Sequence, residues 1–209
     1  DGSSVMNASA HSGFTLLELI ITLIIVGIIV TFGIPSLTEV VENNRISSQV
    51  NEVSSAINFS RSEASKVAGA TITVCPVNDV TDATPDCNGG SVWGSGWAII
   101  LDVDGDGVFD AGDGDQLLKV HQPLAGGNTM EVSGLSSNDG SLIQFAGNGF
   151  PVPPALGAPA SGAITICDGR GQASARAVVV NVSGQTRLAR DTDNDGILND
   201  HNGANVTCP

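Results

Sequence analysis

The aspartates between residues 102 and 113 have the spacing of a calcium-binding loop. The run reads DVDGDGVFDAGD, with carboxylates at its first, third, fifth, ninth and twelfth positions and a glycine at its sixth. This is the EF-hand spacing, in which alternating oxygen ligands surround one ion and the glycine permits a sharp turn. Val108 at the seventh position could add a backbone carbonyl. We therefore expect a calcium site made of Asp102, Asp104, Asp106, Val108, Asp110 and Asp113.

Two features of this loop depart from the EF-hand pattern. Asp113 stands where the pattern has a bidentate glutamate, and the preceding run WAIILD is strand-like rather than helical. The alternative is a hairpin whose aspartates and glycines only make turns. Five clustered carboxylates would repel one another without an ion, so calcium would have an electrostatic role here.

Residues 191–202, DTDNDGILNDHN, repeat the pattern near the C-terminus. Aspartates alternate again, and Gly196 is sixth, but Asn202 at the twelfth position is a weaker ligand than a carboxylate. The run is similar to the calcium loops of thrombospondin type 3 and dockerin repeats. It predicts a second calcium site, with a solvated acidic linker as the alternative. Its candidate ligands are Asp191, Asp193, Asp195 and Asp200.

Glu18 is the single charged residue in the apolar run 14–37. A bilayer core of ~30 Å needs ~20 helical residues, so the run is long enough to span one. A carboxylate within hydrocarbon costs at least ~2.5 kcal/mol and marks a functional position. If residues 1–13 were removed, Phe14 would carry a new terminal ammonium group. Glu18, one helical turn further on, could then pair with that group on its own chain or a neighbour's.

The four cysteines predict two disulfide bonds. None belongs to a CxxC pair, and no histidine lies at zinc-ligand spacing from them. They lie in glycine- and asparagine-rich sequence, which favours disulfides in an oxidising compartment. Three connectivities are possible, and loop closure favours the pairing of sequence neighbours, Cys75–Cys87 and Cys167–Cys208.

Composition and motifs give no support to an enzyme. The chain has 22 acidic and 8 basic residues and a formal net charge of −14. This balance argues against a general nucleic-acid coat or a protein that binds anionic membranes. No nucleotide-binding, hydrolase or metalloprotease motif is present in its required context. We therefore expect no catalytic activity.

The remaining sequence predicts an α+β fold with a long N-terminal helix. Ile46, Val50, Val53 and Ile57 recur at helical spacing, so residues 38–69 should form an amphipathic helix that covers a sheet and ends near Gly69. After Gly69 the pattern changes to short β-rich runs separated by turn residues, which predicts an antiparallel sheet or small sandwich over 70–209. These runs are 70–75, 97–102, 116–120, 130–132, 142–146, 163–167, 175–182 and 185–189.

The N-terminal segment resembles the type IV pilin family, including the pseudopilins of type II secretion. The family motif is a glycine, then a phenylalanine, then a glutamate as fifth residue of the mature chain, and Gly13, Phe14 and Glu18 match it. The later sequence is similar to the GspH/FimT branch of minor pilins and pseudopilins. The resemblance rests on the segments RSEA at 61–64, ITVCP at 72–76, GSGWAIILD at 94–102, ITICD at 164–168 and GQTRLA at 184–189.

This resemblance implies a filament subunit. A prepilin peptidase would remove the leader, residues 1–13, and the Phe14 amine would be methylated. The helix over 14–37 would cross the inner membrane once, with the head in the periplasm, before the subunit joins other pilins or pseudopilins. The leader lacks the usual Lys or Arg, and Met6 is the expected natural start. A pilus and a secretion filament both remain open.

DNA uptake is the alternative function. Some members of this branch use a basic Gly-Arg-x-Arg loop near the C-terminus, but residues 184–187 here read GQTR, with one arginine missing. Arg187 and Arg190 could still neutralise phosphates. The acidic run 191–200 directly behind them argues against DNA as a partner.

Overall fold

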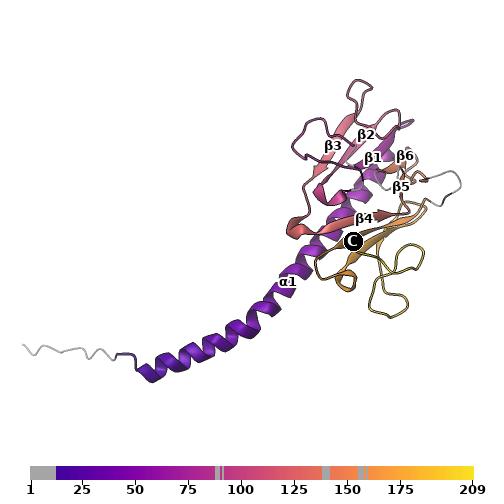
Figure 1. Cartoon of the computed structure of the whole chain (residues 1–209). Coiled ribbons are helices and arrows are strands. Elements are labelled where there is room, and N and C mark those ends of the chain that lie inside the picture. Colours follow the sequence, from indigo (N-terminus) through magenta and orange to yellow (C-terminus); the bar gives the residue numbers. More distant parts are fainter. Residues whose placement is uncertain (1–12, 88–89, 91, 138–141, 155–157, 159) are drawn as a thin grey trace, which may run out of the picture. The chain divides into compact units, whose positions relative to one another are not determined.

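The computed structural model describes residues 13–87, 90, 92–137, 142–154, 158 and 160–209. The predicted leader and Met6 therefore lie outside the described residues, except for Gly13. The described chain divides into two compact units at Glu42 and Asn43, and each unit is treated by itself below. Helix α1, Leu16–Ala64, begins in the first unit and ends in the second (Figure 1).

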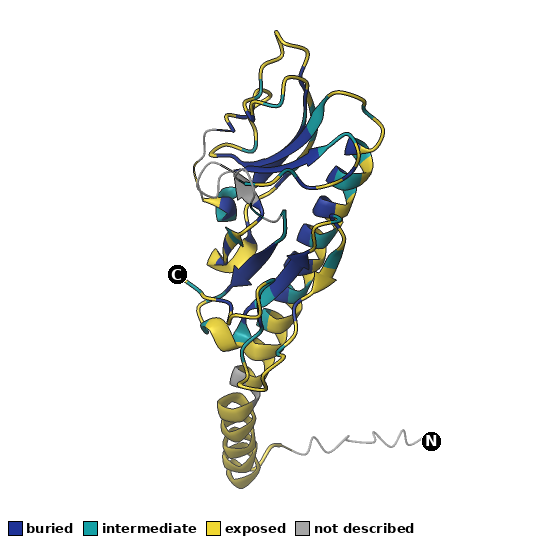
Figure 2. Ribbon diagram, turned by 90° about the vertical axis from the view of Figure 1, so that its right-hand side faces the viewer, coloured by how far each residue is buried: buried dark blue, intermediate teal, exposed yellow. Residues whose placement is uncertain are grey.

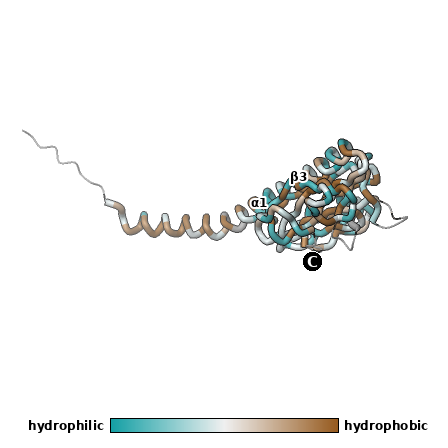
Figure 3. The backbone as a smooth tube through the Cα atoms, turned by 90° about the horizontal axis from the view of Figure 1, so that it is seen from above, coloured by the Kyte–Doolittle hydropathy of each residue, from teal (hydrophilic) through white to brown (hydrophobic). Residues whose placement is uncertain are grey.

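The first unit contains the apolar part of α1. The helix is continuous through position 35, which is a proline. Figure 3 shows this part as a continuous hydrophobic stretch. Its described apolar side chains are exposed, from Leu16 at 77% to Ile20 at 44%. The stretch is long and apolar enough to cross a membrane.

The second unit is built from two antiparallel sheets, and the α+β prediction is confirmed. One sheet has the order β3-β2-β1-β6-β5 and the other has the order β4-β7-β8-β9. The strands are β1 Thr71–Pro76, β2 Trp97–Asp102, β3 Gln116–His121, β4 Thr129–Ser133, β5 Ser136–Ser137, β6 Leu142–Ala146, β7 Gly162–Cys167, β8 Arg176–Val180 and β9 Thr186–Leu188. Short 3₁₀ turns are η1 Trp93–Ser95, η2 Ala125–Gly127 and η3 Gln172–Ser174.

The second half of α1 joins the two sheets through one hydrophobic core. The predicted apolar stripe is buried, and Ile46 and Ile57 are 0% and 2% exposed. These residues pack with Ile72 of β1 and Val178 of β8, which belong to different sheets. Figure 2 shows the buried residues gathered in the strands and on the inner side of this part of the helix.

A second, smaller core lies on the other face of the β7–β8 sheet. Ala177 and Val179 of β8 pack there with Val206 and Leu198 from the C-terminal segment. The C-terminal segment is thus part of the folded head. Alternation along β8 explains the division, because neighbouring strand residues point to opposite faces of the sheet.

Several boundaries differ from the sequence prediction. The helix ends at Ala64, five residues before Gly69, and Gly69 instead adopts a φ of 84° in the connection to β1. The run predicted at 175–182 is a strand only over Arg176–Val180, because residues 181–185 form a turn held by Asn181. The two-residue strand β5 was not predicted.

Candidate functional site

The first aspartate loop gathers three of its predicted ligands. Carboxylate oxygens of Asp102, Asp104 and Asp106 lie within 4.8 Å of one another. Asp102 is fully buried at the end of β2, whereas Asp104 and Asp106 are on the surface. The structure therefore places one buried and two accessible carboxylates at the start of the loop.

Asp102 also organises the loop itself. Its Oδ1 accepts a hydrogen bond from the backbone N–H of Gly105 at 2.7 Å, and its Oδ2 accepts one from the N–H of Gly107 at 3.0 Å. The hydroxyl of Thr73, on β1, donates to the same Oδ2 at 2.7 Å. Hydrogen bonds satisfy this carboxylate without an ion, as the hairpin alternative requires.

The other predicted ligands are not in this group of three. Asp110 Oδ1 accepts a hydrogen bond from the N–H of Gly112, and the N–H of Val108 donates to Asp106. Asp113 is exposed, and its pKa is raised above the ordinary value, chiefly by the negative charge of Asp110. The loop thus carries uncompensated negative charge at the positions where the EF-hand pattern places its later ligands.

Asp115 is a structural residue that sequence reasoning missed. It is 6% exposed, its Oδ1 accepts from the N–H of Val103, and its Oδ2 accepts from the N–H of Asp110. Asp115 therefore links the start of the loop, at Val103, to its later part, at Asp110, just before β3 begins. The Gly114-Asp115 pair ahead of a predicted strand was the available signal, but it fell outside the twelve-position pattern.

The C-terminal loop gathers Asp191, Asp193 and Asp195 in the same way. Their carboxylate oxygens also lie within 4.8 Å of one another. Asp191 accepts backbone N–H bonds from Asn194 at 2.6 Å and Gly196 at 2.8 Å. These bonds, that from Gly196 above all, hold the pKa of Asp191 below its ordinary value. Asp191 is therefore kept ionised, and the cluster is more open to solvent than the first one.

Asp200 is not part of this C-terminal cluster. Its Oδ1 accepts from the N–H groups of Asn202 and Ala204, so it makes the following turn. The neighbouring Asn199 is buried and accepts hydrogen bonds from the N–H and hydroxyl of Thr192. Asn199 also donates to Asn205, and thereby ties the acidic loop to the last residues of the chain.

The oxygen sets of both loops fit calcium better than a softer metal. Carboxylates are hard ligands, and calcium takes ~6–8 oxygens in flexible geometry. Each cluster offers three carboxylates, so backbone carbonyls and water would have to complete the coordination. In the C-terminal loop, Oδ1 of Asp191 accepts the backbone bond from Asn194 and Oδ2 accepts the one from Gly196. In the first loop, Oδ2 of Asp102 already accepts bonds from Thr73 and Gly107.

The structure contains two disulfide bonds, and both join sequence neighbours. Cys75 is linked to Cys87, and Cys167 of β7 is linked to Cys208. This is the pairing that loop closure favoured. The second bond holds the C-terminal segment against the sheet beside the smaller core.

The two candidate DNA-binding arginines are exposed. Arg187 lies in β9 opposite Val179, and Arg190 lies two residues beyond the end of that strand. Within the described part of the chain, neither takes part in an ion pair. Both precede the acidic loop that begins at Asp191, so the local field is mixed rather than basic.

The start of the apolar helix presents the predicted processing residues. Phe14 is 73% exposed and lies two residues before the first residue of α1. Glu18 is in the first turn, and its N–H donates to the hydroxyl of Thr15 at 3.2 Å. Its side chain is exposed among aliphatic residues. Apart from its two chain neighbours, Gly13 has no heavy atom of the described chain within 4 Å of the position of an added Cβ.

Comparison with known proteins gives two family matches and two similar structures. A model described as type II transport protein GspH matches residues 49–184, and one described as prokaryotic N-terminal methylation motif matches residues 8–34. A P21 crystal structure of the type IV minor pilin FimU from Pseudomonas aeruginosa PAO1 is similar with 21% identity and a TM-score of 0.50, covering 71% of this chain and 91% of that one. A P65 crystal structure of FimU from the same strain has 19% identity and a TM-score of 0.48. The match covers 69% of this chain and 92% of that one. No curated protein matches the chain.

Proposed function

Because the chain belongs to the type II transport protein GspH family, we propose that it is a non-enzymatic minor pilin or pseudopilin subunit of a type IV pilus or type II secretion filament. The observation that carries this proposal is the spacing of Gly13, Phe14 and Glu18 at the start of a long helix with an exposed apolar half. The match to the N-terminal methylation motif supports it.

The exposed apolar half of α1 needs an apolar environment. Aliphatic side chains such as Leu23 and Ile29 are 63% and 62% exposed, and each would gain about 1.5–3 kcal/mol on full burial. The inner membrane provides that environment before assembly, with a single crossing and the head in the periplasm. In the filament, the helices of neighbouring subunits replace the lipid.

Prepilin peptidase is the proposed processing enzyme. Cleavage after Gly13 gives Phe14 a free amine, which is then methylated. Glu18 is four residues away, one turn along α1, and its carboxylate pairs with the terminal ammonium of a neighbouring subunit. Such a pair offsets the cost of placing each charge among hydrocarbon groups.

Mass spectrometry of filament-associated protein tests this proposal. The assembled chain should begin at Phe14 and carry one methyl group. Gly13→Val should leave the leader attached, because the branched side chain blocks the cleavage site. An intact leader on assembled wild-type protein contradicts the proposal.

A second experiment separates assembly from membrane insertion. Glu18→Ala should remain in the membrane fraction but enter the filament poorly, since only the pairing charge is lost. Glu39→Ala is the matched control, an exposed glutamate on α1 beyond the apolar run. Normal incorporation of Glu18→Ala, or equal loss in both variants, contradicts the pairing role.

Calcium is the proposed cofactor, with the C-terminal loop as the better site. Asp193 and Asp195 are exposed, and the cluster they form with Asp191 contains no buried carboxylate. An ion there neutralises part of the negative charge next to Arg190 and orders the segment that Cys208 attaches to β7. The first loop is the second proposed site.

DNA binding remains the alternative proposal. The observation that favours it is that Arg187 and Arg190 are exposed and outside any ion pair of the described chain. Binding through two arginines would be weak and would fall with about the second power of salt concentration. Calcium bound behind the arginines should strengthen it. Binding that does not change in Arg187→Gln/Arg190→Gln excludes this route.

A further inference from the structure

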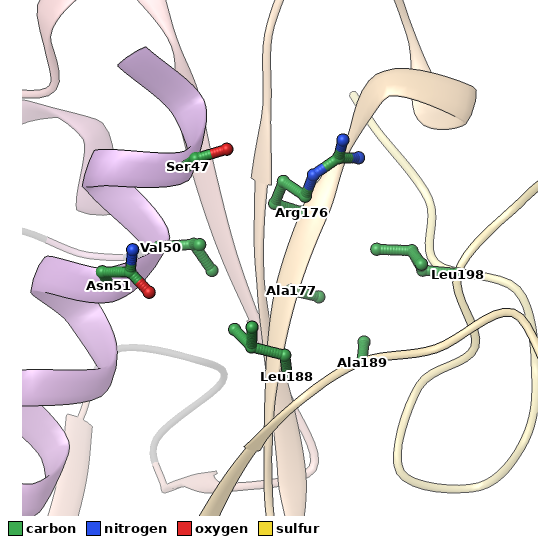
Figure 4. Close-up of a pocket in the computed structure, with 8 residues that line it drawn as sticks. All are labelled: Ser47, Val50, Asn51, Arg176, Ala177, Leu188, Ala189 and Leu198. Atoms are coloured by element: carbon green, nitrogen blue, oxygen red, sulfur yellow. The ribbon is translucent and has the colours of Figure 1, made fainter. Parts of the chain in front are cut away.

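A groove of about 260 Å³ runs between α1 and the strands β8 and β9 within the second unit. Figure 4 shows side chains from the helix on one side and from the strands and the C-terminal loop on the other, with Leu188 directed toward Val50. The lining residues are Ser47, Val50, Asn51, Arg176, Ala177, Leu188, Ala189 and Leu198.

The floor of the groove is apolar and only partly covered. Leu188 pairs with Val178 across the sheet, and the hydroxyl of Thr186, two residues earlier, bonds to Ser54 and Asn58 of α1. This part of β9 is therefore held against the helix. Leu188 is nevertheless 53% exposed, so the groove leaves apolar surface open beside a rigid wall. A concave apolar site of this size accommodates an aliphatic side chain.

The rim of the groove carries hydrogen-bond donors and one positive charge. Arg176 lies on the strand side of the groove, and Ser47 and Asn51 lie on the helix side (Figure 4). The described contacts of Arg176 include one bond, from Nη1 to the carbonyl of Ala175 at 2.9 Å, and no carboxylate partner. Its other guanidinium donors are free to bind a carboxylate in a bidentate manner.

The charge of the groove is the opposite of that of the chain. The protein has 22 acidic and 8 basic residues, yet none of the eight described lining residues is acidic. Charge complementarity therefore selects a partner that brings the negative charge itself. A single arginine beside an apolar floor does not track a phosphate backbone, so the complementary partner is a protein segment.

We propose that this groove docks a segment of another filament subunit in which a leucine-sized side chain stands next to a carboxylate. The aliphatic group contacts Leu188, and the carboxylate binds Arg176. This inference rests on the proposed function, because that function supplies the class of partner. The groove itself can be tested with short peptides, without any filament.

The test uses the full chain, methyl-labelled and held in detergent micelles, with the peptide acetyl-Gly-Leu-Asp-Gly-amide as the probe. Binding should shift the methyl resonances of Leu188, Ala189 and Leu198 in a saturable manner. The peptide with Asn in place of Asp should bind about 1.4-fold to fivefold more weakly, the range expected for one exposed ion pair. The peptide with Ala in place of Leu should bind more weakly still.

Variants of the chain identify the two contacts. Arg176→Gln should abolish the preference for Asp over Asn, whereas Leu188→Ala should weaken both peptides equally and leave that preference intact. Arg187→Gln is the matched control, since it removes an exposed arginine of β9 that does not line the groove. Chemical shifts elsewhere in the head verify that each variant is folded.

Each outcome has a defined consequence. Absence of saturable shifts at these methyl groups overturns the docking proposal, even if the chain is cleaved, methylated and assembled normally. Equal affinity for the Asp and Asn peptides overturns the role of Arg176. Self-association of the chain that Leu188→Ala abolishes would make a second copy the occupant and overturn the proposed partner. Failure of processing or assembly, with peptide binding intact, instead contradicts the proposed function.

Discussion

The imidazole of His121 stacks on the indole of Trp97, with ring centroids 4.7 Å apart and planes 12° from parallel. His121 is 4% exposed, and its Nδ1 lies 3.0 Å from Oε1 of Glu52 on α1. The stack therefore connects the edge strand β3 with β2 and with the helix. The Nε2 atom of His121 is buried without a hydrogen-bond partner among the described residues.

This arrangement predicts that the head loses stability as the pH falls. Burial lowers the pKa of His121 below the ordinary value near 6.5, although the hydrogen bond that its ring donates to Glu52 partly opposes the change, and Lys119 adds to the lowering. The unfolded chain thus gains a proton before the folded chain does. The free energy of unfolding should be constant above about pH 6.5 and decrease below it, by at most about 1.4 kcal/mol per pH unit.

Denaturant unfolding of residues 39–209 between about pH 5 and pH 8 checks this prediction. His121→Phe keeps an aromatic ring against Trp97 and should remove this part of the pH dependence. Glu52→Gln should increase it, because the group that favours the protonated ring is lost. An unchanged slope in His121→Phe assigns the dependence to other groups.

Asp102 should matter more to stability than either of its neighbours in the first loop. Asp102→Ala leaves the buried donors of Thr73 and Gly107 without an acceptor, which should cost at least about 2 kcal/mol. Asp104→Ala is the control at an exposed position and should change stability by less than about 0.5 kcal/mol. Both are measured in the presence of a chelator, so that an ion cannot contribute. Equal losses would mean that Asp102 is not the organiser of the loop.

Calcium should raise the melting temperature of the head. Binding stabilises by about 2.7 kcal/mol when the ion is at about a hundredfold its Kd. Asp193→Ala/Asp195→Ala should lose this gain, whereas Asp82→Ala/Asp86→Ala removes the same charge from an exposed turn and should keep it. A melting temperature that is the same with calcium and with chelator dismisses both loops as sites. A gain that survives Asp193→Ala/Asp195→Ala moves the site to the first loop.

The two disulfides should differ in what they contribute. The Cys167–Cys208 bond closes a separation of 41 residues and the Cys75–Cys87 bond one of 12. Chain entropy then predicts losses of about 4 and about 3 kcal/mol when each pair is replaced by alanine. A non-reducing digest of the exported protein should contain these two linked peptides. Crossed linkages or free thiols would contradict the pairing.

Local patterns predicted the helix well because its signal lies within a few residues. The spacing of Ile46, Val50 and Val53 follows from the helical repeat alone, and all three are buried. The same holds for β2 and β6, whose predicted and observed bounds agree. Where a predicted strand was longer than the observed one, as at 175–182, the observed strand stops at a turn formed by a side chain, here that of Asn181.

Features that depend on distant residues could not be predicted in this way. Val74 of β1 pairs with Ile143 of β6, and the division of the strands between two sheets depends on such contacts. Asp115 takes its role from backbone groups of Val103 and Asp110, which no spacing pattern includes. The groove that Leu188 helps to line joins segments more than a hundred residues apart, so no local motif marks it.

The Cys167–Cys208 bond has a mechanical consequence. Cys167 ends β7, which lies inside its sheet between β4 and β8, whereas β9 is an edge strand. A pull on the end of the chain therefore reaches β7 through the disulfide and bypasses β8 and β9. Load enters the sheet at a strand held on both sides, which must be sheared from two neighbours at once, and the edge strand is not peeled away.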